Sequence, residues 1–161
     1  MKKTGGGMEK ALWSVAIPGF GQLLNGKYFK GSILIFLEFL INMKAHINTL
    51  IVSSFLGKTE LAVQQADYQW LMFYPCVYLF SIWDAYRDAE KKEVPLLYLP
   101  FALSAYIETT GVVYSKTFRI NGFLLGPIFL PMLCIFIGLG VGFILRYIIL
   151  KLSKNQQGQE P

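Results

Sequence analysis

The chain has 161 residues, of which 54% are hydrophobic and 16% are charged, and it carries a formal net charge of +5. The charged share is well below the roughly 25% of an average soluble domain, which argues against a water-soluble protein. The basic residues form no stripe among base-stacking aromatic residues, so we expect no nucleic-acid partner. They flank long apolar segments instead, which is typical of membrane proteins.

The first apolar segment, residues 8–24, is shorter than the ~20 apolar residues that cross a bilayer as a helix. Pro18 breaks or bends a helix, and glycines on both sides of Phe20 permit a tight turn. We therefore predict a short interfacial or re-entrant helix that ends in a turn, where side-chain amides can satisfy free backbone groups. The residues of this turn motif are Pro18, Gly19, Gly21, Gln22, Asn25 and Gly26.

Four longer apolar runs follow, at residues 31–56, 68–86, 94–114 and 123–150. Each is long enough for a helix that crosses about 30 Å of hydrocarbon. We therefore predict an all-α fold, an integral membrane bundle of four transmembrane helices in a single domain of residues 1–152. Residues 153–161 hold no large apolar side chain, and we expect a disordered cytoplasmic tail.

The distribution of positive charge predicts the orientation in the membrane. If residues 1–30 are cytoplasmic, most of the 15 lysines and arginines fall on the cytoplasmic side. Such an excess favours a multi-pass protein of the cell membrane with both termini inside. Basic residues at that face also predict contact with anionic lipid.

The first long run is unusually polar for a helix that faces lipid. Glu38, Asn42 and His46 follow an i, i+4, i+8 spacing and share one face of a helix. Lys44 lies at about the same predicted depth as Glu108 of the third run, and we predict that the two form a buried pair. These five residues are a candidate intramembrane network. They could form a proton or cation path, with His46 as the titrating group, or only pack inside the bundle, with Lys44 and His46 reaching an outer face.

Asp84, Arg87 and Asp88 form a charge cluster at the predicted inner end of the second run. Asp84 lies three residues before Arg87 and four before Asp88, so all three lie on one side of a helix. Arg87 can therefore bridge both carboxylates. A divalent cation between the two aspartates is the weaker alternative, since it would lack further ligands.

Residues 18–22 (PGFGQ), 25–26 (NG), 30–31 (KG) and 83–87 (WDAYR) carry a family resemblance. This stretch resembles small bacterial multi-pass membrane proteins, in which a PGxGQ…NG…G turn precedes one span and a D-A-Y-[RK] sequence closes the next. The resemblance covers roughly residues 8–89. It implies a location in the bacterial inner membrane and no particular activity.

Catalytic chemistry finds little support in the sequence. His46 is the one histidine and has no nucleophile beside it, and neither an HExxH, a P-loop nor a dinucleotide fingerprint is present. Glycine pairs at 122/126 and 138/142 instead predict close packing of helices. We expect no metal or cofactor, and a non-catalytic scaffold, accessory or regulatory subunit that contacts lipid and either a second copy or another membrane protein. The alternative is a small oligomeric transporter or channel-like protein that moves protons or cations.

Overall fold

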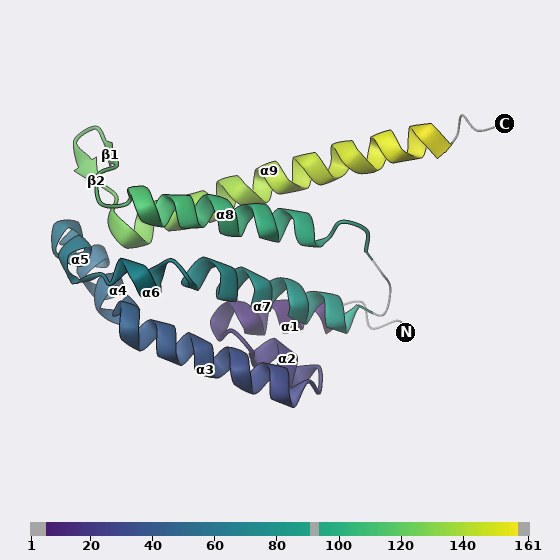
Figure 1. The fold of residues 1–161 in the computed structure, drawn as a ribbon, viewed down its shortest axis with the longest axis horizontal. Coiled ribbons are helices and arrows are strands. Elements are labelled where there is room, and N and C mark those ends of the chain that lie inside the picture. The colour runs from purple at the N-terminus through teal and green to yellow at the C-terminus, as the bar shows by residue number, and fades with distance from the viewer. Residues whose placement is uncertain (1–5, 91–93, 158–161) are drawn as a thin grey trace.

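A computed structural model describes residues 6–90 and 94–157, and this part of the chain is almost entirely helical (Figure 1). In chain order the elements are α1 (Gly6–Ala16), α2 (Phe20–Leu24), α3 (Tyr28–Ala45), α4 (Ile47–Phe55), α5 (Thr59–Gln65), α6 (Tyr68–Leu71), α7 (Tyr74–Ala89), α8 (Tyr98–Tyr114), β1 (Arg119–Ile120), β2 (Phe123–Leu124) and α9 (Gly126–Gln157).

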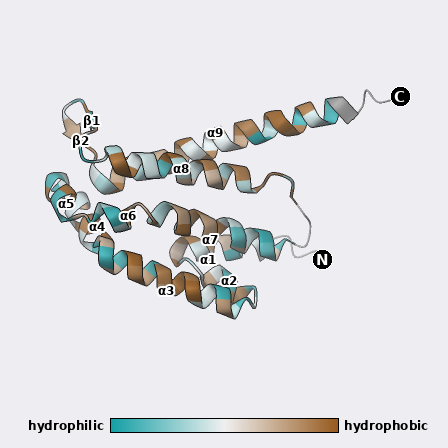
Figure 2. Cartoon of the chain, in the orientation of Figure 1, coloured by the Kyte–Doolittle hydropathy of each residue, from teal (hydrophilic) through white to brown (hydrophobic). Residues whose placement is uncertain are grey.

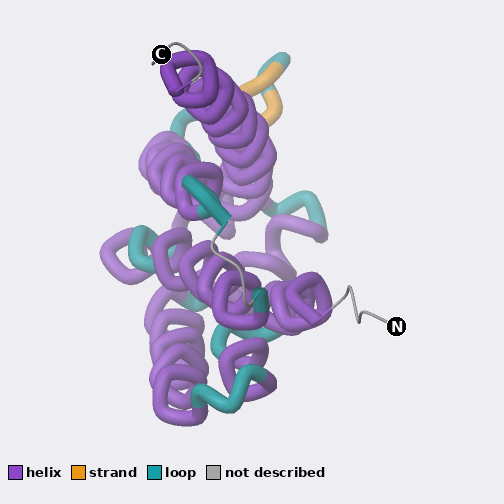
Figure 3. Tube along the Cα trace, turned by 90° about the vertical axis from the view of Figure 1, so that its right-hand side faces the viewer, coloured by secondary structure: helices purple, strands orange, loops and turns teal. Residues whose placement is uncertain are grey.

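Helix α7 lies in the middle of the arrangement. On one side it packs against α1, α2 and α3, and on the other against α8, which in turn packs along α9. The end view in Figure 3 shows the same stacking of helices. The largest buried apolar cluster lies where α3, α4, α5 and α6 meet, around Ile41, Leu50 and Ala62. The described part of the chain is therefore all-α apart from one hairpin, whose two strands have two residues each.

The predicted turn after the first apolar segment is present. Helix α1 ends at Ala16 and α2 begins at Phe20, so the helix is interrupted around Pro18. Gly19 has φ 100°, a left-handed conformation that glycine adopts without steric cost. The break lets α2 fold back against α1 and lead into α3.

The run at residues 31–56 is not the single straight span that we predicted. It forms α3 and α4, which meet at an angle of 59°. His46 is the residue between them and has φ 58° and ψ 31°, which stops the helical hydrogen-bond ladder. Asn42 Nδ2 donates to Asn48 Oδ1 across the break over 3.4 Å. Some of the polar residues of this run therefore lie at the bend between α3 and α4.

The next two predicted spans also differ from single straight helices over their whole length. The run at residues 68–86 forms α6 and α7, with Pro75 in the first turn of α7, a position that proline favours. The run at residues 94–114 becomes helical only at Tyr98, because Pro95 and Leu96, which has φ 54°, precede the helix. Among the described residues, α9 alone is one unbroken helix long and apolar enough to cross a bilayer, and α3 with α4 would make a second if the bent pair is one span.

Helix α9 begins at Gly126 rather than at Phe123, because the residues before it form the β1–β2 hairpin. Asn121 and Gly122 have φ 49° and 82°, and such paired positive angles are typical of a two-residue Asn-Gly turn. The helix continues to Gln157, so the first residues of the predicted disordered tail are helical, with Lys154 in the favourable last turn. Residues 158–161 of that tail lie outside the described residues. Figure 2 shows that hydrophobic residues predominate along most of α9.

Helices α8 and α9 approach each other closely through glycine. A Cβ on Gly138 would overlap the Cα of Ser104, and one on Gly142 would overlap the Cα of Pro100. Ser104 Oγ also donates to the carbonyl oxygen of Ile135 over 3.0 Å. The pair at 138/142 thus packs helices as predicted, but the pair at 122/126 does not. Both of those glycines have positive φ: Gly122 lies in the hairpin turn, and Gly126 is the first residue of α9.

Candidate functional site

The turn after α1 is held against α7 by a buried set of polar groups. The Gly19 N–H donates to Ser81 Oγ over 2.9 Å. Gln22 Nε2 donates to the Ser81 carbonyl oxygen over 2.8 Å and to Asp84 Oδ2 over 3.1 Å. Gln22 and Ser81 are completely buried. Because unpaired amides are costly away from water, these bonds fix the position of the turn.

Two glycines of the motif make that approach sterically feasible. A Cβ on Gly19 would come within 2.5 Å of the Gly31 carbonyl oxygen at the start of α3. A Cβ on Gly21 would overlap the Lys10 carbonyl oxygen and lie 2.7 Å from the Ala85 Cβ. Asn25 adds a further link between the same elements, since its Nδ2 donates to the Ala85 carbonyl oxygen over 2.9 Å and its Oδ1 accepts from Lys10 Nζ over 2.7 Å. The motif is therefore the point where α1, α2, α3 and α7 meet.

The charge cluster completes this network. Arg87 Nη2 lies 2.8 Å from Asp84 Oδ1 and 2.9 Å from Asp88 Oδ1, which agrees with the expected bridge. Lys30 Nζ lies 3.0 Å from Asp84 and 3.1 Å from Asp88. Only 1% of the Asp84 side chain is exposed, so this carboxylate depends on its donors. We call this set the polar clamp, made of Gln22, Lys30, Ser81, Asp84, Arg87 and Asp88.

Ion pairing within the polar clamp shifts two pKa values. Burial opposes the ionisation of Asp88, but hydrogen bonds from Arg87 and Lys30 outweigh it and lower the pKa of Asp88 below its ordinary 3.8. Burial likewise opposes the charge of Lys30, but its bonds to Asp84 and Asp88 prevail and raise the pKa of Lys30 above its ordinary 10.5. Both groups therefore keep their charge over a wider pH range in the folded chain than in the unfolded chain.

These shifts predict how stability depends on pH. Asp88 stabilises the fold in full above pH 3.8, and its contribution is lost as the pH falls further through its lowered pKa. Lys30 contributes in full below pH 10.5 and loses its contribution above that value. We expect the melting temperature to fall when the pH is taken below 3.8, and to fall less in Asp88→Asn. An equal fall in both proteins, measured by circular dichroism in one detergent, would contradict this prediction.

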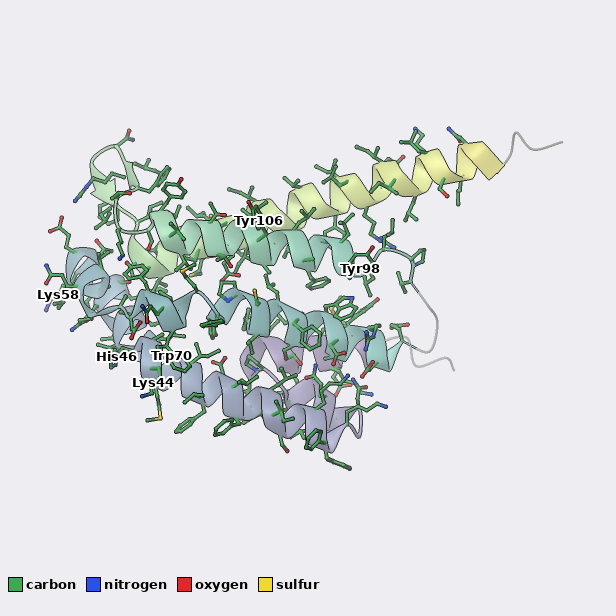
Figure 4. All side chains as sticks on the ribbon, viewed as in Figure 1. Lys44, His46, Lys58, Trp70, Tyr98 and Tyr106 are labelled. Carbon is green, nitrogen blue, oxygen red and sulfur yellow. The ribbon has the colours of Figure 1, made fainter. Side chains whose placement is uncertain are left out.

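The predicted pair of Lys44 and Glu108 is not formed. Lys44 and His46 are exposed at the junction of α3 and α4 (Figure 4). Glu108 belongs to α8, which packs on the opposite side of α7 from α3. The prediction rested on the two residues lying at about the same depth in the membrane. Equal depth does not determine which helices pack against each other. The exposure of both residues agrees with the alternative that they reach an outer face.

The two acidic residues of the candidate network form no salt bridge with Lys44 or His46. Glu38 and Glu108 each bury one carboxyl oxygen, Oε2, that has no hydrogen-bond partner within the described part of the chain. The phenol of Tyr74 on α7 lies beside the Glu38 carboxyl group. Glu108 is 4% exposed and lines a cavity of about 560 Å³ between α4, α7, α8 and α9. Of the five candidate network residues, Lys44 and His46 are therefore exposed, Glu38 and Asn42 are half-buried, and Glu108 is buried.

Sequence reasoning missed several residues that matter at these sites. Ser81 was not singled out, although it lies three residues before Asp84 and so on the same face of a helix. Lys30 was recognised as part of the motif and as a topology signal, but its pairing with Asp84 was not foreseen. Tyr74 and Tyr78, which line the Glu108 cavity, appear in the sequence only as members of an apolar run. Their role depends on which helix packs against α7.

The polar clamp is suited to hold helices together. Both of its carboxylates are already bonded by Lys30 and Arg87, so they are not free to hold the divalent cation considered above. Within residues 6–90 and 94–157, His, Cys, Asp and Glu side chains form no group of three or more that could hold a metal ion. No family model matches the chain, and neither a curated protein nor a solved structure is similar enough to count as a match.

Proposed function

We propose that this chain is a multi-pass integral membrane protein of the bacterial inner membrane, with four spans and both termini in the cytoplasm. In this proposal it acts without catalysis, as a scaffold, accessory or regulatory subunit that works through helix packing. The family resemblance of residues 8–89 supports the location. The bent pair of α3 and α4, the pair of α6 and α7, helix α8 and helix α9 would supply the four crossings.

The observation that carries the membrane proposal is the exposure of α9. Its candidate span is Gly126–Asn155, and the most apolar 18-residue window of this span has a mean hydropathy of 2.6, yet only 22% of that window is buried. A core helix of a soluble protein would be mostly buried. Phe136 and Ile144, for example, are 69% and 61% exposed. Such a surface is costly in water and favourable in lipid.

The distribution of charge along the molecule supports the proposed orientation. Figure 1 shows the start of α1 and the end of α9 on the side where α2 and the end of α7 lie, and α5 and the hairpin on the opposite side. The first side carries Lys10, Lys27, Lys30, Arg87, Arg146, Lys151 and Lys154, and the second carries Lys58, Lys116 and Arg119. An excess of lysine and arginine marks the cytoplasmic side of a membrane protein.

The packing role is supported by how the polar groups are used. The polar clamp ties α2, α3 and α7 together, and the glycines of α9 bring it against α8. The transport alternative is less well supported, because Lys44 and His46 are exposed and the predicted pair of Lys44 with Glu108 is not formed. A continuous path needs these groups to converge.

Cysteine accessibility tests the topology. We expect a membrane-impermeant maleimide to label Lys58→Cys on intact cells, but Lys151→Cys only after the membrane is opened. Cys76 and Cys134 are first replaced by alanine, so each variant carries one thiol. Equal labelling of both variants on intact cells, or the reverse pattern, would contradict the proposed orientation.

The same expressed protein tests the packing role. After crosslinking in the membrane and gentle detergent extraction, we expect the chain to migrate with a defined partner or as a defined oligomer. Liposomes that contain the purified chain are expected to show no proton or cation flux beyond that of empty liposomes. A monomer that produces flux abolished by Glu108→Gln would instead favour the transport alternative.

A further inference from the structure

The walls of the cavity beside α8 are almost entirely apolar. Its volume of about 560 Å³ falls within the roughly 300–1,000 Å³ of small-molecule sites. Apolar side chains form most of the wall, and the aliphatic ones include Ile47 and Ile51 of α4, Leu79 and Ile82 of α7, and Ile135 and Leu139 of α9. The surface is therefore suited to the apolar body of a ligand.

A single charged side chain, Glu108, is found among the described residues that line this cavity. Phe101, Glu108 and Val112 recur at a spacing of seven and four residues, so one face of α8 is turned toward the cavity. Glu108 is 96% buried, and its Oε2 has no hydrogen-bond partner in residues 6–90 and 94–157. A buried carboxyl group without a partner takes up a proton and stays neutral, and it becomes ionised when a cation approaches it.

The two cations of the polar clamp do not pair with Glu108. Lys30 and Arg87 are both bonded to the clamp aspartates at the end of α7. Lys44 is exposed on α3, on the far side of α7. Within residues 6–90 and 94–157, no lysine or arginine forms a salt bridge with Glu108, so a cation that pairs with it would be a ligand.

Aromatic rings stand next to the carboxyl group in the cavity wall. Tyr74 and Tyr78 of α7 stack with their ring centroids 5.4 Å apart and 19° between their planes. Phe101 of α8 and Phe136 of α9 line the same cavity. Aromatic faces attract cations, and this attraction is larger where water is excluded.

We propose that this cavity binds a lipophilic monovalent cation, whose apolar body contacts the aliphatic walls and whose charge pairs with Glu108 beside the tyrosine rings. A neutral acyl chain would fill the same volume but would leave the carboxyl oxygen without a partner. An apolar anion would gain no ion pair with Glu108 and would itself oppose the ionisation of this group. The proposal does not depend on the number of membrane spans, because the cavity is formed within the chain itself.

Two probes of matched shape and opposite charge test the ligand class. The full chain, purified in detergent, is titrated with tetraphenylphosphonium and with tetraphenylborate, and binding is measured by calorimetry. We expect saturable binding of the phosphonium and none of the borate. Loss of a buried charge pair costs at least ~2 kcal/mol, so Glu108→Gln should weaken phosphonium binding about thirtyfold or more. Borate binding as tight as that of the phosphonium, or unchanged affinity in Glu108→Gln, would overturn the proposal.

Two further variants separate loss of the site from loss of the fold. Glu60→Gln removes a carboxyl group that is 70% exposed and does not line the cavity, and should leave the affinity nearly unchanged. Met132→Trp enlarges a 42% exposed residue of the cavity wall and should weaken binding while the chain still unfolds at the wild-type temperature. An equal loss in Glu60→Gln, or full binding in a folded Met132→Trp, would count against the assigned cavity.

Discussion

Replacing Asp84 by asparagine is expected to lower the free energy of unfolding by about 3 kcal/mol. Asp84 Oδ1 accepts from Lys30 and Arg87, and Oδ2 accepts from Gln22 and Lys30. In either orientation of the asparagine amide, its NH2 group replaces an accepting oxygen and faces hydrogen-bond donors, so those hydrogen bonds are lost. The expected value lies at the lower end of the range for broken buried pairs, because Lys30 and Arg87 are 38% and 46% exposed and can turn toward water.

Asp67→Asn is the matched control for this experiment. Asp67 is an exposed aspartate whose side chain caps α6, and asparagine caps a helix equally well. Both variants lose one negative charge, but only Asp84→Asn disturbs the polar clamp. Unfolding of the detergent-solubilised chain, followed by circular dichroism, measures the difference. A loss in Asp84→Asn no greater than that in Asp67→Asn would contradict the structural role of the clamp.

The second large effect is expected at the contact of α8 and α9. Gly138→Ala should destabilise the chain by about 2 kcal/mol, because the new Cβ would overlap the Cα of Ser104, a backbone atom that cannot rotate away. Gly142→Ala should behave alike against Pro100. The expected result is lower stability in both variants together with a weaker association of the two helices.

Gly140 provides the control on the same helix. A Cβ at this position would meet no atom within 4 Å, so the open side of α9 accepts a larger residue. Gly140→Ala should leave stability unchanged or raise it by up to about 1 kcal/mol, since alanine favours the helix over glycine. All three variants can be compared in one denaturant titration. Equal effects at Gly138 and Gly140 would show that helix propensity, and not close packing, determines the outcome.

Several features could be predicted from the chain because they depend on near neighbours. Pro18 and Gly19 break a helix wherever they occur, and the structure has that break. Asp84 and Arg87 are three residues apart, so any helix places them together. Apolar runs of sufficient length predict helices, and most of the observed helices fall within them. Each of these conclusions rests on interactions within one or two turns.

Other features depend on which segments become neighbours in space. The bond from Gln22 to Asp84 joins residues 62 apart, and their residue types do not predict that they meet. Depth along the helices suggested that Lys44 pairs with Glu108, but α7 lies between their helices. The left-handed backbone at His46 likewise bends a run whose composition is compatible with a straight helix.

The helical nature of the chain and its apolar runs therefore follow from the order of its residues, since hydrogen bonding and hydrophobicity act locally along the chain. The polar clamp and the isolation of Glu108 in an apolar cavity follow from packing. Lys30 can neutralise Asp84 only because the turn at Gly19 brings α3 alongside α7. Glu108 keeps an unpartnered oxygen because α8 packs against the opposite side of α7 from Lys44.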